Sequence, residues 1–357
     1  MSGNFDKFTG TRAVAPRLAF DAARLAAWMR SIGLDAGSLE VAQFKGGQSN
    51  PTYLVTAGAR RYALRRKPPG KLLPSAHAVD REYRVMTALA GTDVPVPKTY
   101  ALCEDAEVIG TPFFLMDYVE GRVLWDPRLA ELTPKERGTH YAELNRVIAA
   151  LHLVDPAAVG LADYGKPGNY LARQIDRWSR QYRASETERI EAMDRLIEWL
   201  PANIPPGEET SIVHGDYRID NAIFHPTEPR ILAVLDWELS TLGHPLADFA
   251  YHCMTWRMPE GAHARGLAGA DLAALGIPTE REYIAMYCKR TGRDRIDHFE
   301  YYLAYNMFRL AAILQGVMAR ALQGNAASAE ALDAGRRTRA IAEEGARQVD
   351  RMLATKT

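Results

Sequence analysis

One stretch near the middle of the chain constrains the fold most, because short apolar runs alternate there with polar side chains that carry oxygen atoms. It reads Ile-Val-His-Gly-Asp-Tyr-Arg-Ile-Asp-Asn over 212–221. A second apolar run follows over 231–235 and leads into Asp236, fifteen residues after Asn221. Short apolar runs bounded by turn residues predict buried strands. The chain must therefore contain a small β structure whose connections carry Asp216, Asn221 and Asp236.

The sequence before this stretch predicts a β-rich unit. Residues 1–19 are expected to form a flexible lead-in, and a helix with one apolar face begins near Asp21 and ends near Gly33. A second helix is expected over 76–90. Five strands are predicted, with this helix between the third and the fourth, over 39–44, 53–56, 61–64, 98–103 and 112–118.

The remainder of the chain is predicted to be mostly helical. The segments 133–136 and 279–282 both have a threonine followed three residues later by a glutamate, which is the spacing of a helix capping box. The predicted fold class is α+β, with an N-terminal five-stranded antiparallel sheet, one main helix, and a helical C-terminal lobe with a small β insert. The expected boundaries are 1–35 for an N-terminal extension and helix, 36–120 for the β-rich lobe, and 121–357 for the helical lobe.

Composition excludes several classes of function. The 357 residues include 44 Lys and Arg and 44 Asp and Glu, so net charge gives no sign of a nucleic-acid or anionic membrane partner. Three cysteines lie far apart without the spacing of a zinc site. No uncharged run approaches the roughly 18 residues of a membrane helix, and the N-terminus lacks the apolar core of a signal peptide. We therefore expect a cytoplasmic protein with no nucleic-acid or membrane partner. The sequence carries no indication of the oligomeric state.

Asp216, Asn221 and Asp236 together indicate phosphoryl transfer. A carboxylate can orient an acceptor hydroxyl and accept its proton. Amide and carboxylate oxygens suit Mg²⁺, which binds few protein groups alongside substrate phosphates. Each residue alone is explained equally well by turn chemistry, in which Asp and Asn hydrogen-bond their own backbone. The complete pattern H-x-D-x4-N, followed by Asp236, favours the functional interpretation.

Three residues close in sequence to this pattern are assigned structural roles or roles that stay open. His214 follows an apolar run and is predicted to be a buried, hydrogen-bonded support rather than a catalyst. Glu238 either adds a metal contact or faces solvent. Asp248 is either the carboxylate favoured near a helix N-terminus or a brace for the backbone of the 214–221 loop; both roles are structural.

The β-rich unit offers further candidates, each with a plain alternative. The turn over 46–50, Gly-Gly-Gln-Ser-Asn, can cradle phosphate oxygens with backbone N–H groups or simply connect two strands. Arg65 and Glu82 either form a pair that positions a nucleotide phosphate or are separately solvated. The run over 113–119 is a core strand, and its end can also present backbone groups to an adenine edge.

In this order, the motifs resemble those of the aminoglycoside phosphotransferase/choline kinase branch of the protein-kinase-like fold, over 36–330. Residues 214–221 resemble that family's catalytic loop, HGDxxxxN. The resemblance implies ATP and Mg²⁺ as cofactors, Asp216 as the base or hydroxyl-orienting carboxylate, and Asn221 and Asp236 as Mg²⁺ ligands. Asp248 stands where the family has a loop-bracing Asp.

The resemblance also implies a nucleotide-binding role for the β-rich lobe. Its hinge corresponds to 116–119, with the Asp117 carbonyl and the Val119 N–H facing adenine. Glu82 is implied as the helix partner of a cation on the third strand.

Two departures from the kinase pattern affect the phosphate-binding residues. Arg65 stands where protein kinases have lysine, and Lys67 and Lys71 are alternatives for its role. A GxGxxG loop is absent, which leaves Gly47, Ser49 and Asn50 as the expected phosphate-side contacts.

The acceptor is expected to be a small molecule, because the chain lacks an HRD arginine and an APE segment. Residues 257–357 carry 15 Lys and Arg against 12 Asp and Glu, and the helix after Asp248 offers Tyr251, His252, Met254 and Trp256. That mixture suits an apolar or anionic hydroxyl compound better than a polycationic aminoglycoside. The segment 65–77 most resembles the kinase-like domains fused to some acyl-CoA dehydrogenases, which implies a hydroxyacyl thioester or hydroxy acid as acceptor.

Two other functions stay open at this point. A nucleotide-binding regulatory module without turnover would usually lack the base, the amide or the metal-binding carboxylate, and here all three are present. A metal-dependent hydrolase built on His214, Asp216 and Asp236 leaves the hinge and the Gly-Gly turn without a role.

Overall fold

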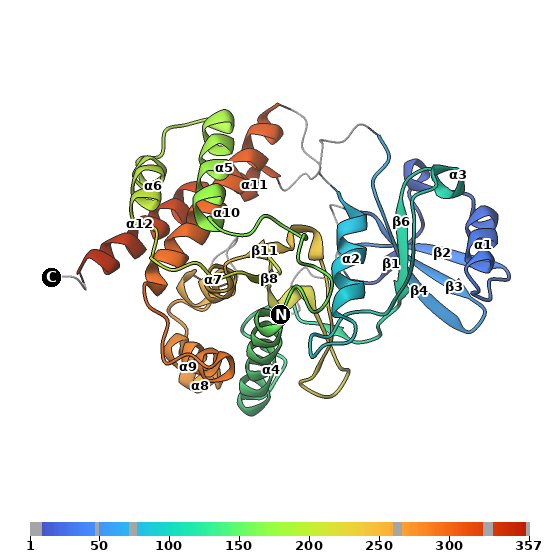
Figure 1. The fold of residues 1–357 in the computed structure, drawn as a ribbon, viewed down its shortest axis with the longest axis horizontal. Coiled ribbons are helices and arrows are strands. Elements are labelled where there is room, and N and C mark those ends of the chain that lie inside the picture. Colours follow the sequence, from blue (N-terminus) through green and yellow to red (C-terminus); the bar gives the residue numbers. More distant parts are fainter. Residues whose placement is uncertain (1–8, 47–49, 71–76, 260–265, 324–330, 355–357) are drawn as a thin grey trace. The chain divides into compact units, whose positions relative to one another are not determined.

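The chain folds into two compact units. The computed structural model describes residues 9–46, 50–70, 77–259, 266–323 and 331–354. Unit 1 comprises Met1–Trp125 and Asn221–Ser240, and unit 2 comprises Asp126–Asp220 and Thr241–Thr357. Figure 1 shows the β-rich character of unit 1 and the helical character of unit 2.

Unit 1 is built on a six-stranded sheet in which all neighbouring strands are antiparallel. Its order is β1-β2-β3-β4-β6-β5, with bounds Thr11–Arg12, Leu39–Phe44, Thr52–Ala57, Arg60–Arg66, Phe113–Asp117 and Thr99–Cys103. All five predicted strands are present, which confirms the predicted fold class of this half. The expected flexible lead-in is wrong for its described part, because β1 pairs with β2 and Leu18 is buried.

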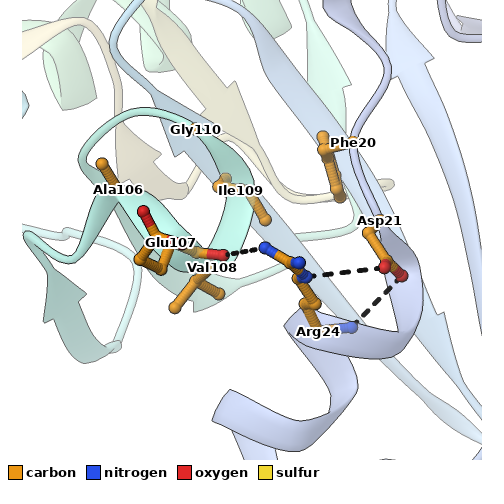
Figure 2. Close-up of a pocket in the computed structure, with 8 residues that line it drawn as sticks. All are labelled: Phe20, Asp21, Arg24, Ala106, Glu107, Val108, Ile109 and Gly110. Atoms are coloured by element: carbon orange, nitrogen blue, oxygen red, sulfur yellow. Dashed lines mark hydrogen bonds and ion pairs between the residues drawn. The ribbon is translucent and has the colours of Figure 1, made fainter.

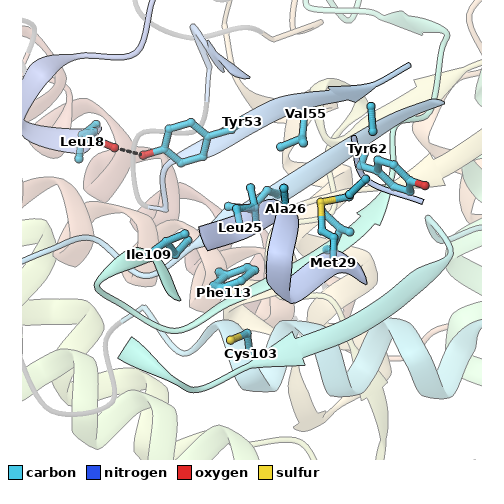
Figure 3. Packing of buried hydrophobic residues seen from close by; sticks show 14 residues of the cluster. Leu18, Leu25, Ala26, Met29, Tyr53, Val55, Tyr62, Cys103, Ile109 and Phe113 are labelled. Atoms are coloured by element: carbon cyan, nitrogen blue, oxygen red, sulfur yellow. Dashed lines mark hydrogen bonds between the residues drawn. The ribbon is translucent and has the colours of Figure 1, made fainter. Parts of the chain in front are cut away.

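Two helices cover opposite faces of this sheet. Phe113 contacts Trp28 of α1 (Ala22–Ser31), with ring centres 4.7 Å apart, and Phe114 contacts Tyr83 of α2 (Val79–Leu89), with ring centres 6.0 Å apart. Consecutive residues of a strand point to opposite faces, so α1 and α2 lie on different sides. The α1 side holds an apolar core that includes Leu25 and Met29 (Figure 3).

A small three-stranded sheet explains why residues 221–240 belong to unit 1. Its order is β10-β9-β7, with bounds Ile231–Val234, Ala222–Phe224 and Arg122–Val123. The connector strand β7 pairs with β9, and a Cβ on the preceding Gly121 would lie 2.3 Å from the Phe224 carbonyl oxygen. Only glycine permits this approach. The division therefore differs from the expected boundary at 121, which assigned this hairpin to the helical lobe.

Unit 2 consists mainly of helices. They are α4 (Pro134–Leu153), α5 (Tyr170–Ser185), α6 (Glu191–Ala202), α7 (Pro245–Arg257), α8 (Leu272–Leu275), α9 (Glu280–Thr291), α10 (Phe299–Leu322), α11 (Ala331–Gly335) and α12 (Thr338–Ala354). Both predicted capping boxes are formed, at Thr133 and at Thr279. β8 (Ser211–Val213) pairs with β11 (Thr241–Gly243). Among the described residues of the whole chain, no helix is both long enough and apolar enough to cross a membrane.

The core beneath α1 gives a stability prediction. Leu25 is fully buried in unit 1, whereas Leu153, at the end of α4, is 59% exposed. Leu25→Ala should lower the free energy of unfolding by about 2–5 kcal/mol, because it leaves a cavity as well as losing buried apolar surface. Leu153→Ala removes the same atoms from an exposed site and should change it by less than about 0.5 kcal/mol. Urea denaturation of both variants measures the difference, and equal effects would show that α1 does not stabilise the fold.

Candidate active site

The loop over 214–220 in unit 2 is held by a buried carboxylate on α7. Asp248 accepts hydrogen bonds from the backbone N–H groups of His214 and Gly215, each at 2.8 Å. Gly215 has a φ of +83°, in the left-handed region that favours glycine. Of the two roles considered for Asp248, the structure therefore shows the one that braces the loop.

Asp248 is itself fixed by a histidine from α4. His152 Nε2 lies 3.2 Å from Asp248 Oδ2, and His152 Nδ1 lies 2.7 Å from the Tyr287 hydroxyl. Burial by itself would raise the pKa of Asp248, but the hydrogen bond and charge of His152 and the backbone N–H of His214 outweigh it, so that pKa is lowered. The carboxylate is thus stabilised as an anion inside unit 2. The sequence analysis did not identify His152, since a lone histidine ending a helix carries no distinctive pattern.

Asp216 presents its carboxylate at the surface of this braced loop. Its side chain is 19% exposed. Tyr251 of α7 donates its hydroxyl hydrogen to Asp216 Oδ1, and Arg218 Nε lies 3.1 Å from the same oxygen. The Asp216 N–H donates to His214 Nδ1 at 3.2 Å, and His214 is fully buried, in agreement with its predicted supporting role.

The residues expected on the acceptor side of α7 have different environments. His252, Met254 and Trp256 are buried. The His252 ring lies 2.8 Å from the Tyr283 hydroxyl, and burial lowers the pKa of His252 to about 4. These three side chains belong to the core of unit 2, whereas Tyr251 reaches Asp216. The sequence analysis grouped all four because helical spacing alone did not show which faced the core.

In unit 1, one buried cation joins two carboxylates from separate elements. Arg65 Nε, on β4, lies 2.7 Å from Glu82 Oε2, on α2. Arg65 Nη2 lies 2.7 Å from Asp236 Oδ1, which follows β10. Glu238 Oε2 lies 4.0 Å from that nitrogen. Arg65 and Glu82 are therefore paired and buried rather than separately solvated.

The charges of this cluster stabilise one another. Burial alone would lower the pKa of Arg65, but the charges of Glu82 and Asp236 outweigh it and raise that pKa. Burial raises the pKa of Glu82, although the adjacent guanidinium opposes the rise. Arg65 therefore stays charged and holds Asp236 in place.

The predicted phosphate-side turn is only partly described. Gly47, Ser49 and Lys71 lie outside the described residues. Asn50 is fully buried, its amide Nδ2 donates to Glu82 Oε1 at 2.7 Å, and its Oδ1 lies 3.0 Å from His77 Nδ1. Its side chain thus supports the Arg65–Glu82 pair.

The two predicted metal ligands come together at one end of the β9–β10 hairpin. The Leu235 N–H donates to the Asn221 carbonyl at 2.8 Å, and Asp236 is the next residue. Asp236 has a φ of +66°, and its side chain is 35% exposed. The described residues contain no group of three or more His, Cys, Asp or Glu arranged to hold a metal ion. The predicted ligands Asn221 and Asp236 are an amide and a carboxylate, and such hard oxygen donors are the kind that Mg²⁺ prefers.

The predicted hinge is the end of β6. The Asp117 N–H donates to the Lys98 carbonyl at 2.8 Å, and the Tyr100 hydroxyl donates to Asp117 Oδ1 at 2.5 Å. Val119 follows the strand outside any regular element. These two hydrogen bonds hold the backbone and the side chain of Asp117 in place at the end of β6.

A hollow elsewhere on unit 1 contains none of the predicted residues. It has a volume of about 420 Å³ and is lined by Phe20, Asp21, Arg24 and residues 106–110 (Figure 2). Arg24 Nη1 donates to the Glu107 carbonyl at 2.9 Å, and Asp21 caps α1. Its polar groups satisfy one another, so we assign it no chemistry.

The Arg65 cluster can be tested against an exposed ion pair of the same unit. Arg65→Met leaves Glu82 buried without its cation and should lower the free energy of unfolding by about 3–5 kcal/mol. Arg61 pairs with Glu120 at 2.6 Å on the surface, so Arg61→Met should cost less than about 1 kcal/mol. Urea denaturation at neutral pH compares the two. Similar small losses would show that Arg65 is not needed to hold Glu82.

The loop brace gives a prediction about pH. The pKa of Asp248 is lowered on folding, so its stabilising contribution is present above the unfolded pKa of about 3.9 and is lost as the pH falls through the lower folded pKa. Asp248→Asn should therefore cost roughly 3 kcal/mol at pH 5–8, and the difference from the wild type should shrink below about pH 4. Exposed Asp297→Asn is the control. Denaturation across this pH series would contradict the role of Asp248 if the loss were independent of pH.

Comparison with known proteins places this geometry in a family. Residues 40–285 match the model of the phosphotransferase enzyme family. The chain is 49% identical over 330 residues to acyl-CoA dehydrogenase family member 10 of Mus musculus, covering 90% of this chain and 31% of that protein. It is 40% identical over 349 residues to acyl-CoA dehydrogenase family member 11 of Rattus norvegicus, covering 96% and 45% respectively. The chain thus spans less than half the length of these relatives.

Solved structures agree with this placement. A crystal structure from Ralstonia eutropha, named as an aminoglycoside phosphotransferase, is 57% identical with a TM-score of 0.86, covering 93% of this chain and 99% of that chain. Choline kinase from Cryptosporidium parvum is 13% identical with a TM-score of 0.63, covering 94% and 97%. The aminoglycoside phosphotransferase APH(4)-Ia, solved with ADP and hygromycin B, is 16% identical with a TM-score of 0.56, covering 90% and 97%. The last two show likeness of fold alone. The chain belongs to the phosphotransferase enzyme family and has its kinase-like fold.

Proposed function

We propose that the chain transfers the γ-phosphate of ATP to a hydroxyl group of a small molecule and requires Mg²⁺. The observation that carries the proposal is the partly exposed Asp216 carboxylate on a loop whose backbone is fixed by buried Asp248. A general base must be both accessible and held in a defined geometry. Membership of the phosphotransferase enzyme family supports the same reaction.

Asp216 acts as the base or hydroxyl-orienting carboxylate. It accepts the proton of the acceptor hydroxyl as the oxygen attacks the γ-phosphorus and the bond to ADP breaks. This reaction needs little covalent help from the protein, so positioning and charge neutralisation supply most of the rate.

Arg65 binds the nucleotide phosphates. Glu82 orients its guanidinium through Nε, and the guanidinium supplies the positive charge for the phosphate oxygens. Asn50 supports Glu82, and backbone N–H groups at Gly47 and Ser49 are the proposed contacts to the phosphates.

The adenine ring is placed by backbone groups of the hinge. We assign it the Asp117 carbonyl and the Val119 N–H. The side-chain bond from Tyr100 to Asp117 and the backbone bond to Lys98 fix this segment and support the assignment.

Asn221 and Asp236 would hold Mg²⁺. When bound, the ion neutralises negative charge on the phosphate oxygens during transfer. Asp236 is oriented for this by Arg65, and the main-chain bond between Asn221 and Leu235 keeps the two donors together.

The acceptor is proposed to be a hydroxyacyl thioester or a hydroxy acid rather than an aminoglycoside. Two cations, Arg218 and Arg309, lie close to Asp216 in unit 2, which disfavours a polycation. The relatives named as acyl-CoA dehydrogenase family members support an acyl compound. The three cysteines are free, which supports a reducing, cytoplasmic location.

ADP formation in a screen of hydroxylated acyl compounds and hydroxy acids tests this function. Asp216→Asn should lower turnover on the best acceptor by roughly 10²–10⁴-fold, because it removes the proton acceptor. Exposed Asp350→Asn, which loses only its pair with Arg195, should keep the wild-type rate.

Other outcomes of the screen would identify the alternatives. ATP binding without turnover on any acceptor would favour a regulatory module. Product release without ATP would favour a metal-dependent hydrolase. Full activity in Asp216→Asn would show that another residue is the base.

A further inference from the structure

Tyr251 contacts Asp216 from a different element, and its hydroxyl is directed at one carboxylate oxygen. It lies on α7, three residues after the loop brace Asp248, and donates its hydroxyl hydrogen to Asp216 Oδ1. Burial, together with the negative charge of Asp216, raises the pKa of Tyr251, so the phenol keeps its proton and stays a donor.

Arg309 of α10 fixes the phenol in place. Its guanidinium carbon lies 5.4 Å from the centre of the Tyr251 ring, a cation–π contact. Arg309 Nη2 also donates to the Gly215 carbonyl at 2.9 Å. One buried side chain therefore ties the Tyr251 ring to the backbone of the loop that carries Asp216.

We propose that Tyr251 is a positioning residue that holds the Asp216 carboxylate through Oδ1 in the orientation in which it takes the proton of the acceptor hydroxyl. This inference rests on the proposed function of Asp216 as the base. In the transfer step, the acceptor oxygen forms a bond to the γ-phosphorus, the bond from that phosphorus to the ADP oxygen breaks, and ADP keeps its electron pair. The acceptor proton moves to the Asp216 carboxylate, and Tyr251 keeps its own proton throughout.

Arg218 is the competing candidate for this role, and its geometry is less selective. Arg218 Nε lies 3.1 Å from Oδ1, and its Nη2 donates to Oδ2 at 3.4 Å. The Arg218 side chain is 47% exposed, and its Nη1 also lies 3.5 Å from Asp220 Oδ2. An exposed, shared arginine is screened by solvent and holds one geometry poorly. The phenol, fixed by Arg309, distinguishes the two carboxylate oxygens.

Tyr251→Phe tests the proposal on the acceptor found in the screen. We expect kcat to fall roughly 10- to 100-fold with KM for ATP unchanged. Tyr301→Phe is the matched control, because the buried Tyr301 hydroxyl donates only to the Leu200 carbonyl, at 2.9 Å. That variant should lose stability without any change in kcat.

A measurement that needs no turnover separates this proposal from the proposed function. A hydrogen-bonded hydroxyl proton on a carboxylate gives a downfield ¹H NMR signal. We expect a signal that is absent in Tyr251→Phe and moved in Asp216→Asn, whether or not any acceptor is phosphorylated. An unchanged signal in Tyr251→Phe, or an unchanged kcat, would overturn the positioning role. A loss of kcat in Arg218→Met but not in Tyr251→Phe would assign that role to Arg218 instead.

Discussion

The hydrogen bonds from two backbone N–H groups to the buried Asp248 carboxylate are the constraint on which the catalytic loop depends. A buried anion is stable only if it is fully hydrogen-bonded. Asp248 meets this requirement through His214, Gly215 and the His152 ring. The same bonds give the loop a single backbone conformation, including the left-handed Gly215. The position of Asp216 follows from this backbone conformation, because it is the residue after Gly215.

Unit 1 contains a similar arrangement, in which the buried ion is a cation instead of an anion. There, the buried group is the Arg65 guanidinium, satisfied by Glu82, and the partly exposed carboxylate that it orients is Asp236. In each unit a buried ion holds a carboxylate that remains accessible to ligands. Removing either buried ion alone leaves its partner groups buried and unsatisfied, so both the stability and the orientation of the neighbouring groups depend on it. The geometry of each half of the machinery therefore rests on one desolvated charge.

Regular elements were predictable where local signals were strong. Alternation identified the strands of unit 1, and the Thr-x-x-Glu spacings identified the starts of α4 and α9. β1 was missed because a two-residue edge strand has no periodicity, and it forms only because β2 offers a free edge. The pairing of β7 with β9, which assigns residues 221–240 to unit 1, joins segments about one hundred residues apart and has no local signature.

The sequence by itself determined the chemical identities and spacing of the site, since Asp216, Asn221 and Asp236 stand in an order that turn chemistry alone does not explain. It also determined which runs were apolar enough to be strands. Only the tertiary structure decided which polar side chains meet: that Arg65 joins Glu82 to Asp236, that His152 fixes Asp248, and that Tyr251 rather than His252 reaches Asp216. The physical reason is that each of these contacts joins residues at least 17 positions apart, and their burial and direction depend on packing that no local pattern encodes.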